Sequence, residues 1–318
     1  MSLLLLDSAS LYWRAFHALP DSITAPNGMP INAVRGLLDT IAVLAHDRHP
    51  DRVIACWDND WRPQWRVEAV ASYKANRLAD EDGPATSGHD GAAEEVPDLL
   101  GPQIPVIRAL LPTLGISVHG ADGWEADDVI ARLAMAESSN GLLADVASGD
   151  RDLVQLVDPQ TTLLYTGGTA KSRGGAPWLT YTPEAVIERF GVRPDQYALM
   201  ASLRGDPSDG LPGIKGIGER TAVVLVTAFN DLTGLLHAAQ HAPTAKPMTP
   251  RLAQALLDDW PALQAAYSVT YLRGDTPIAD PPPVGTPDLV AARQLAQQWG
   301  LERSVERVIA AMAQTSTG

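Results

Sequence analysis

Leu3-Leu-Leu-Leu-Asp7 is the stretch from which the fold can be predicted. Consecutive apolar residues in a run this short predict a fully buried β-strand, and this strand stops at an acidic residue. The pattern returns at residues 52–57, which stop at Asp58, and at residues 141–147, which end just before Gly149-Asp150. We therefore expect three buried strands, each with an aspartate just beyond its end.

Segments with helical apolar spacing alternate with these strands. They are residues 10–18, 32–46, 97–114 and 125–136, with a further short strand at 116–119. Strands that alternate with helices predict an α/β fold with a parallel, helix-flanked central sheet. Functional groups of such sheets gather at the carboxyl ends of the strands. Asp7, Asp58 and Asp150 therefore mark a candidate site at one edge of the sheet.

The pattern becomes wholly helical from about residue 182. We place a catalytic α/β domain at residues 1–180 and a smaller α-helical domain at residues 181–318. Residues 79–96 are rich in glycine, acidic and small residues without an apolar period, which is typical of a mobile surface loop. The proline-rich stretch 276–287 is typical of an extended connector.

The composition is that of a globular protein, with 45% hydrophobic and 19% charged residues among 318. Cys56 is the single cysteine, so no disulfide can form within the chain, as suits a reducing compartment. No apolar run approaches the roughly 20 residues that a membrane helix needs. We expect a cytoplasmic monomer with no membrane partner.

The formal net charge of −14 argues against a polyanionic partner. The acidic residues are concentrated in a few motifs, however, while lysines and arginines occupy separate short segments. Bound divalent cations neutralise carboxylates locally. The net charge therefore weakens the case for a nucleic-acid partner without excluding one.

Nine acidic residues form the candidate metal site: Asp7, Asp58, Glu125, Asp127, Asp128, Asp150, Asp152, Asp206 and Asp209. Taken singly, such acids are common at helix N-termini and in turns. Gathered at one sheet edge within about 4–6 Å, they repel one another. A hard cation relieves this repulsion, and all-oxygen ligation without His or Cys favours Mg²⁺ or Mn²⁺. Roughly two or three such ions support hydrolysis of phosphodiesters.

A glycine-rich segment follows the last of these acids and opens a helix. It reads Leu211-Pro-Gly213-Ile-Lys215-Gly216-Ile-Gly218-Glu-Arg220. Glycines allow backbone N–H groups to approach phosphates, and a helix N-terminus adds partial positive charge. Such contacts hold a nucleic-acid backbone without reading its sequence. The alternative is an ordinary tight turn between two helices.

Basic and aromatic residues interleave before the 79–96 loop. The basic residues are Arg62, Arg66, Lys74 and Arg77, and the aromatic ones are Trp61, Trp65 and Tyr73. This combination suits a single nucleic-acid strand, through phosphate pairing and base stacking. The alternative is that the aromatic rings pack in the core while the charges are solvated. We expect a flexible arch over the site at about residues 73–96.

In this order, the motifs resemble the 5′-nuclease or flap endonuclease family, which includes the N-terminal 5′-3′ exonuclease domain of bacterial DNA polymerase I. The resemblance extends over roughly residues 3 to 270. The matching stretches include Leu-Leu-Leu-Asp7-Ser, Tyr73-Lys74-Ala-Asn-Arg77, Glu125-Ala-Asp-Asp128, Gly-Asp150-Arg-Asp152 and Gly-Asp206-Pro-Ser-Asp209 with the glycine-rich segment.

The resemblance implies a PIN-like nuclease domain and a role for each matching residue. The nine acids correspond to the metal-site acids of the family. Lys74, Arg77 and Arg14 correspond to cations that contact the reacting phosphate. The segment containing Gly213, Lys215, Gly216, Gly218 and Arg220 corresponds to the helix-three-turn-helix motif, at about residues 194–230, which in the family grips duplex DNA and often holds K⁺. Arg62, Arg66 and Tyr73 are further candidate DNA contacts.

We therefore expect a stand-alone, structure-specific 5′-3′ exonuclease and 5′-flap endonuclease of replication or repair. Its substrate is branched or 5′-ended DNA, and a polymerase or sliding clamp is a candidate partner. Gly210 departs from the family, which usually has Asn there. Two alternatives stay open: a PIN-type ribonuclease, and a DNA-junction binding module that lacks catalysis.

Overall fold

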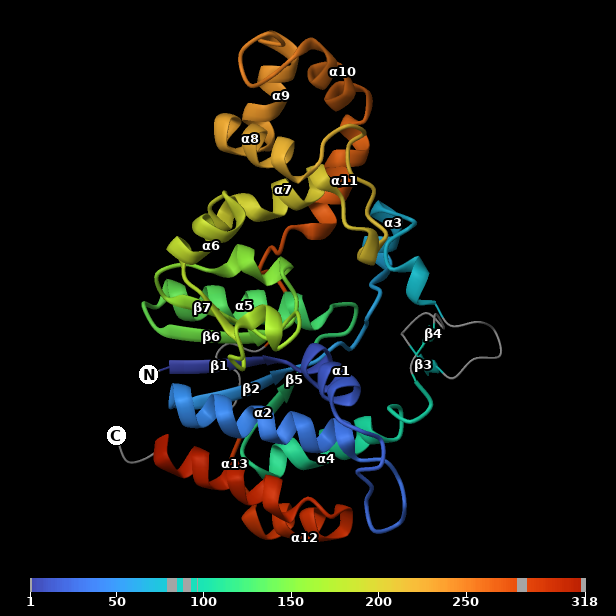
Figure 1. The fold of residues 1–318 in the computed structure, drawn as a ribbon, viewed down its shortest axis with the longest axis vertical. Coiled ribbons are helices and arrows are strands. Elements are labelled where there is room, and N and C mark those ends of the chain that lie inside the picture. Colours follow the sequence, from blue (N-terminus) through green and yellow to red (C-terminus); the bar gives the residue numbers. More distant parts are fainter. Residues whose placement is uncertain (1, 79–84, 88–92, 96, 279–284, 316–318) are drawn as a thin grey trace.

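The computed structural model describes residues 2–78, 85–87, 93–95, 97–278 and 285–315. A six-stranded sheet lies between two layers of helices, and a group of helices extends from one of these layers (Figure 1). The α/β fold with a smaller helical part, expected from the sequence, is confirmed.

The sheet has the strand order β5-β2-β1-β6-β7-β8. The strands are β1 (Ser2–Asp7), β2 (Arg52–Cys56), β5 (Ser117–His119), β6 (Leu143–Ser148), β7 (Thr161–Tyr165) and β8 (Leu179–Tyr181). All neighbours are parallel except β7 and β8, which are antiparallel. The expected parallel sheet is therefore confirmed, with an antiparallel strand added at the β8 edge. The sequence patterns also missed β7 and β8, whose apolar runs are short.

The leucines of β1 are buried against both layers of helices. Leu3 and Leu5 belong to one hydrophobic core, whereas Leu4 and Leu6 belong to another. Successive side chains of a strand point to opposite faces, so a strand covered on both faces is apolar throughout. This is why four leucines in a row lie at the centre of the sheet, between β2 and β6.

One face of the sheet is covered by helices from both ends of the chain. They are α1 (Ser8–Ala18), α2 (Asn32–Arg48), α4 (Gln103–Thr113), α12 (Leu289–Trp299) and α13 (Glu302–Thr315). Helix α13 packs along α2, and α12 contacts α4 (Figure 1). Residues 289–315 therefore pack with the helices on this face of the sheet and not with the helical part, which corrects the expected second domain of 181–318.

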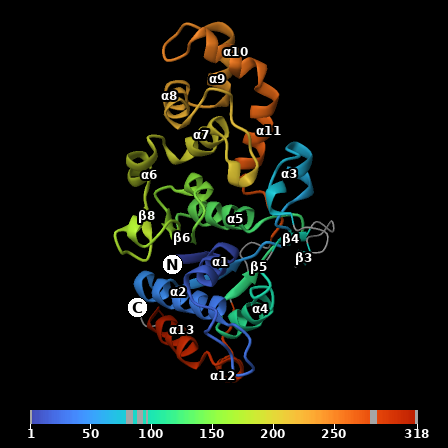
Figure 2. The same ribbon diagram turned by 45° about the vertical axis from the view of Figure 1, so that its right-hand side comes forward.

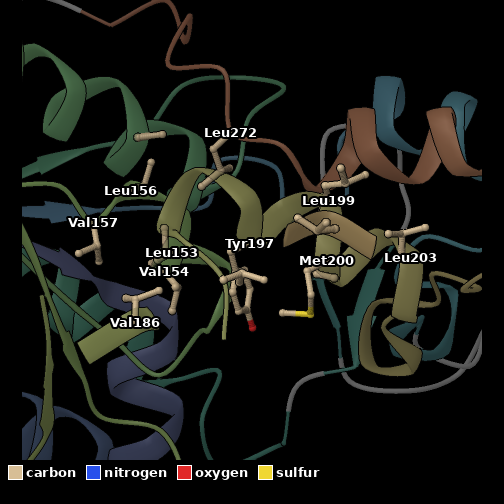
Figure 3. Packing of buried hydrophobic residues seen from close by; sticks show 14 of the residues in the cluster. Leu153, Val154, Leu156, Val157, Val186, Tyr197, Leu199, Met200, Leu203 and Leu272 are labelled. Carbon is tan, nitrogen blue, oxygen red and sulfur yellow. The ribbon is translucent and has the colours of Figure 1, made fainter. Parts of the chain in front are cut away.

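The other face of the sheet carries α5 (Ala126–Ser139), above which the helical part extends (Figures 1 and 2). The helical part consists of α6 (Pro183–Phe190), α7 (Tyr197–Arg204), α8 (Glu219–Phe229), α9 (Leu232–His241), α10 (Pro250–Asp258) and α11 (Trp260–Thr270). Tyr197 and Met200 of α7 share a core with Leu153 and Val154, which follow β6 (Figure 3). This continuous core joins the helical part to the sheet.

The segment between β2 and α4 contains α3 (Gln64–Ala69) and a short antiparallel pair, β3 (Ala85–Ser87) with β4 (Ala93–Glu95). The remainder of the expected arch, residues 79–84, 88–92 and 96, lies outside the described residues. Its mobility stays a prediction. Among the helices of the described ranges, none has by itself the length and apolar composition to cross a membrane.

A pair of valines tests the placement of the C-terminal helices. Val305 of α13 is fully buried, whereas Val290 of α12 is 69% exposed. We expect Val305→Ala to lower the free energy of unfolding by about 2 kcal/mol, because a buried valine loses its packing. Val290→Ala is the matched control and should change it little. Equal effects of the two substitutions in urea unfolding would contradict the packing of α13 on α2.

Candidate metal and DNA site

Asp7 lies at the carboxyl end of β1, where it is fixed by neighbouring strands and helices. Its carboxylate accepts a hydrogen bond from the backbone N–H of Ser10 (3.2 Å) and so caps α1. It also accepts one from the hydroxyl of Ser148, the last residue of β6. The same hydroxyl accepts a bond from the N–H of Asp150 (2.8 Å). Ser148 therefore ties the ends of β1 and β6 together, a role that the sequence analysis missed.

A cavity of about 430 Å³ opens at this edge of the sheet. Five predicted acids line it: Asp7, Asp58, Glu125, Asp127 and Asp150. Two more, Asp152 and Asp209, line a narrow adjoining pocket that shares Glu125, Asp127 and Asp150. The structure thus gathers seven of the nine acids around one space, which we call the acid cavity. Strand ends supply some of them and the start of α5 supplies others.

The acids of this cavity are buried or half-buried, and they lie around one space. Burial, with Asp58 and Asp150 nearby, raises the pKa of Asp7 to about 7. Burial and the neighbouring carboxylates Asp150 and Asp7 raise the pKa of Asp127 well above its usual range. The pKa of Asp152 is raised in the same way, by burial and by the neighbouring carboxylate of Asp150. These carboxylates need protons or cations to be tolerated together.

Along one wall of the acid cavity, lysine and arginine side chains of the protein are paired with the carboxylates. Lys74 Nζ donates to Glu125 Oε2 at 2.6 Å, and Arg66 lies 3.5 Å from the other oxygen of the same carboxylate. Although burial acts in the opposite direction, Lys74 and Arg66 lower the pKa of Glu125. Arg77, on the same wall, donates to Asp209 at 2.6 Å. Lys74 and Arg77 therefore lie at the acid cavity, where the sequence analysis placed them.

The donor set of the acid cavity fits a hard divalent cation. Its ligands would be carboxylate oxygens, the atoms that Mg²⁺ and Mn²⁺ prefer. Burial first, and then the neighbouring carboxylates, raise the pKa values of Asp7 and Asp127, and a bound cation would oppose both effects. In the described parts of the chain, no group of three acid, His or Cys side chains could hold a metal ion as placed. As placed, the acids surround a space but do not form a complete set of metal ligands.

Asp128 and Asp206 have other partners. Asp128 forms a two-pronged ion pair with Arg66, with both N–O distances at 2.8 Å. Asp206 accepts from the backbone N–H of Ser208 at 2.9 Å and lies 3.9 Å from Arg204. Neither lines the acid cavity or the pocket beside it. We therefore do not include these two acids in the proposed set of metal ligands.

Three residues expected to contact DNA are engaged within the protein instead. Arg66 is 2% exposed, and its guanidinium lies 4.5 Å from the ring centre of Trp65. Tyr73 is also buried, and its hydroxyl donates to Glu125. Arg62 donates to the backbone carbonyls of Tyr73 and Ala71. Arg66 and Tyr73 are buried as placed, and a role of these three residues in contacting DNA stays a prediction.

Arg14 is not among the residues that line the acid cavity, although its side chain lies close to Gly149, beside Asp150. It is half-buried and donates to the carbonyl of Gly168 at 2.9 Å, in the loop between β7 and β8. Arg173 donates to the same carbonyl, and burial with this second cation lowers the pKa of Arg14. The structure thus separates Arg14 from Lys74 and Arg77, with which the sequence analysis grouped it.

The glycine-rich segment between α7 and α8 presents its polar groups to solvent. Ile214 and Ile217 are buried, whereas Lys215, Gly216, Gly218 and Arg220 are exposed. Gly218 is the N-cap of α8, and no side chain caps that helix. Gly213 packs so closely on Arg204 that a Cβ would lie 2.2 Å from its carbonyl oxygen. Two isoleucine anchors thus hold an exposed, basic turn, which we call the gripping turn.

Thermal unfolding at two pH values tests the charge balance of the acid cavity. The folded-state pKa of Asp7, about 7, exceeds its ordinary value of 3.8, so the folded protein retains a proton that the unfolded chain releases. The free energy of unfolding of the metal-free protein therefore falls as pH rises between these values. We expect Mg²⁺ to raise Tm, and to raise it more at pH 8 than at pH 5.5, because protons and cations compete for the same oxygens.

Asp127→Asn serves as the comparison for this experiment. It removes one of the repelling charges, so we expect it to raise the Tm of the metal-free protein at pH 8 and to reduce the effect of Mg²⁺. An equal effect of Mg²⁺ at both pH values, in the wild type and the variant alike, would contradict this account.

Arg66→Met tests whether Arg66 is structural. The substitution leaves the buried carboxylate of Asp128 without its cation and leaves Glu125 with Lys74 alone, so we expect a loss of about 3–5 kcal/mol in the free energy of unfolding. Arg220→Met removes an exposed cation and should leave urea unfolding unchanged. If Arg66→Met unfolded like Arg220→Met, the structural role of Arg66 would be wrong.

Comparison with known proteins gives the family. Residues 2–191 match the 5′-3′ exonuclease N-terminal resolvase-like domain, and residues 192–284 match the 5′-3′ exonuclease C-terminal SAM fold. A 5′-3′ exonuclease of Streptomyces coelicolor is 46% identical over 96% of this chain and 98% of its own length. DNA polymerase I of Mycobacterium leprae is 40% identical over 74% of this chain, which is 23% of its own length.

Solved structures with the same fold are more distant in sequence. T5 5′-exonuclease with bound zinc superimposes with a TM-score of 0.63 at 15% identity, covering 99% of this chain and 100% of that chain. The catalytic core of Rad2 in complex with DNA substrate gives a TM-score of 0.59 at 16% identity, covering 98% and 92%. The resemblance seen in the sequence motifs is thus confirmed, and this chain belongs to the 5′-3′ exonuclease family.

Proposed function

We propose that this chain hydrolyses DNA phosphodiester bonds near a 5′ end or at the base of a 5′ flap. The observation that carries the proposal is the acid cavity, where seven carboxylates surround a space bordered by Lys74 and Arg77. Divalent cations in such a cavity activate water and stabilise charge on phosphate oxygens. The proposed ligands are Asp7, Asp58, Glu125, Asp127, Asp150, Asp152 and Asp209.

Lys74 and Arg77 would position the reacting phosphate. Lys74 is fixed by Glu125 and by the carbonyl of Trp61 (3.3 Å), so its amine is held before any substrate arrives. A donor held in place where negative charge develops lowers the barrier without reorganisation. Arg77 is 39% exposed and is therefore accessible to a phosphate. Arg14 would act outside the acid cavity, on a more distant phosphate.

The gripping turn would hold the duplex part of the substrate. Lys215 and Arg220 are exposed, and the uncapped N-terminus of α8 offers backbone N–H groups to a phosphate. The contacts are to the backbone, so they would not depend on base sequence. The same proposal includes K⁺ bound at this turn and Mg²⁺ or Mn²⁺ bound in the acid cavity. It also includes a polymerase or sliding clamp as a partner, a monomeric state and a cytoplasmic location.

Asp127→Asn and Asp150→Asn test the proposed chemistry. We expect each to lower the single-turnover cleavage rate of a 5′-flap DNA in Mg²⁺ by at least about a hundredfold, because each removes a charged ligand. Binding of the flap without metal should be retained. Glu306→Gln is the control, because Glu306 is an exposed acid of α13 whose partner is Arg293. Undiminished cleavage by both cavity variants would overturn the proposal.

The substrate of the wild type separates the remaining alternatives. A 5′-flap, a nicked duplex and a blunt duplex, each of DNA, are compared with single-stranded RNA in Mg²⁺ and in Mn²⁺. We expect the flap DNA to be cleaved fastest, because it offers a duplex to the gripping turn and a single strand to the acid cavity. Preferential cleavage of RNA would favour the PIN-type ribonuclease, and binding without any cleavage would favour the junction-binding module.

A further inference from the structure

Two segments far apart in the sequence are joined beside the acid cavity. The backbone N–H of Lys74 donates to the carbonyl of Asp209 at 2.9 Å. The hydroxyl of Ser72 donates to the carbonyl of Gly210 at 2.7 Å, and the amide of Asn76 donates to that of Ser208 at 3.3 Å. Residues 72–77 and 206–210 therefore form one contact, which we call the clasp.

Gly210 makes the close approach of the clasp possible. Its φ is +67°, in the left-handed region that glycine adopts most readily. A Cβ at this position would lie 2.0 Å from the backbone carbonyl oxygen of Ser72. Any side chain at position 210 must therefore push residues 72–74 away, because the obstacle is backbone and not the end of a flexible side chain.

The backbone of Lys74 is itself held in an unusual conformation. Its φ is +47°, in the left-handed region, which is uncommon for a residue with a side chain. The bond to Asp209 holds its N–H, and Arg62 holds the preceding carbonyl, of Tyr73, at 2.6 Å. The amine then reaches Glu125 at 2.6 Å. The direction of the Lys74 side chain thus depends on the clasp.

The 206–210 side of the clasp is continuous with the gripping turn. Asp206 and Leu211 exchange backbone hydrogen bonds of 2.9 and 2.8 Å, which closes the loop between them. Leu211 is buried against Tyr73 and Val269. Only a few residues separate this closed loop from Lys215, so a change at Gly210 has a direct physical route to both Lys74 and the gripping turn.

We propose that Gly210 is a positioning residue, which places the amine of Lys74 at the acid cavity and ties that placement to the gripping turn. The inference rests on the proposed function of the acid cavity and adds a residue to it. It also gives a physical meaning to glycine at position 210, because the two segments could not approach as they do with a side chain there.

Gly210→Asn is the sharpest test, since Asn tolerates the left-handed region better than most residues with a side chain and therefore isolates the clash. Gly141→Asn is the matched control: its φ is +69°, and a Cβ there meets nothing within 4 Å. We expect Gly210→Asn to lower the single-turnover cleavage rate of a 5′-flap DNA by about ten- to a hundredfold, as small misplacements of catalytic groups do. Gly141→Asn should cleave like the wild type.

The Lys74→Ala background shows whether Gly210 acts through Lys74. There we expect Gly210→Asn to cause little further loss of rate, because the group that it displaces is already absent. Loss of the same factor in both backgrounds, or no loss in the wild type, would overturn the inference. If the wild type itself fails to cleave the flap, the proposed function fails instead.

Chemical labelling of lysine amines in the metal-free protein gives a readout independent of cleavage. The side chain of Lys74 is only 12% exposed and is paired with Glu125, so its amine should react slowly with a methylating reagent. Gly210→Asn should make Lys74 react several-fold faster, while exposed Lys215 reacts as before. Unchanged labelling of Lys74, measured by mass spectrometry of a variant with wild-type Tm, would show that Gly210 does not position it.

Discussion

Mutual repulsion among buried carboxylates is the constraint on which the rest of this structure depends. The parallel strands bring Asp7 and Asp150 to one edge, and the start of α5 adds Glu125 and Asp127. The chain compensates this charge unevenly. Arg66 and Lys74 lower the pKa of Glu125, whereas the pKa values of Asp7 and Asp127 stay raised. The compensated wall fixes the amine of Lys74, and the uncompensated acids would be the ones to receive cations.

The burial of Arg66 explains how the protein stabilises the side of the acid cavity whose carboxylates are paired with cations. A buried charge is tolerated only when it is paired and hydrogen-bonded. Arg66 makes two bonds to Asp128, approaches Glu125 and donates to the carbonyl of Val269, at the end of α11. It therefore connects α3, α5 and the helical part at one point, and it provides Asp128 with a paired cation beside the acid cavity.

Much of this arrangement follows from the sequence, because it depends on local pattern and on simple topology. A short apolar run ending in Asp7 predicts a strand and an acid at its end, and parallel strands place such acids at the same edge. The pairing of charges does not follow, because it depends on tertiary contacts. Arg66 beside Trp65 has the same local pattern whether it stacks on bases or lies buried against the ring.

The boundary of the helical part is another feature that depends on tertiary contacts and not on local sequence pattern. Helical spacing in residues 289–315 predicts α12 and α13 but contains no information on which surface they cover. The core contacts of Val305 and Val308 place them against the first half of the chain. Likewise, β8 could not be predicted, because a three-residue edge strand has too few residues to show a period.

The uneven compensation also bears on how a chain with a net charge of −14 would hold DNA. Exposed Lys215 and Arg220 can attract phosphates at the gripping turn, while the acid cavity repels them until cations enter. The two steps of recognition therefore differ in kind. Binding of the duplex would depend on side chains that are always positive, whereas entry of the reacting phosphate would depend on how far cations have neutralised the acid cavity. Binding and cleavage would then respond differently to cations, and the clasp at Gly210 is the contact that lies between the two regions.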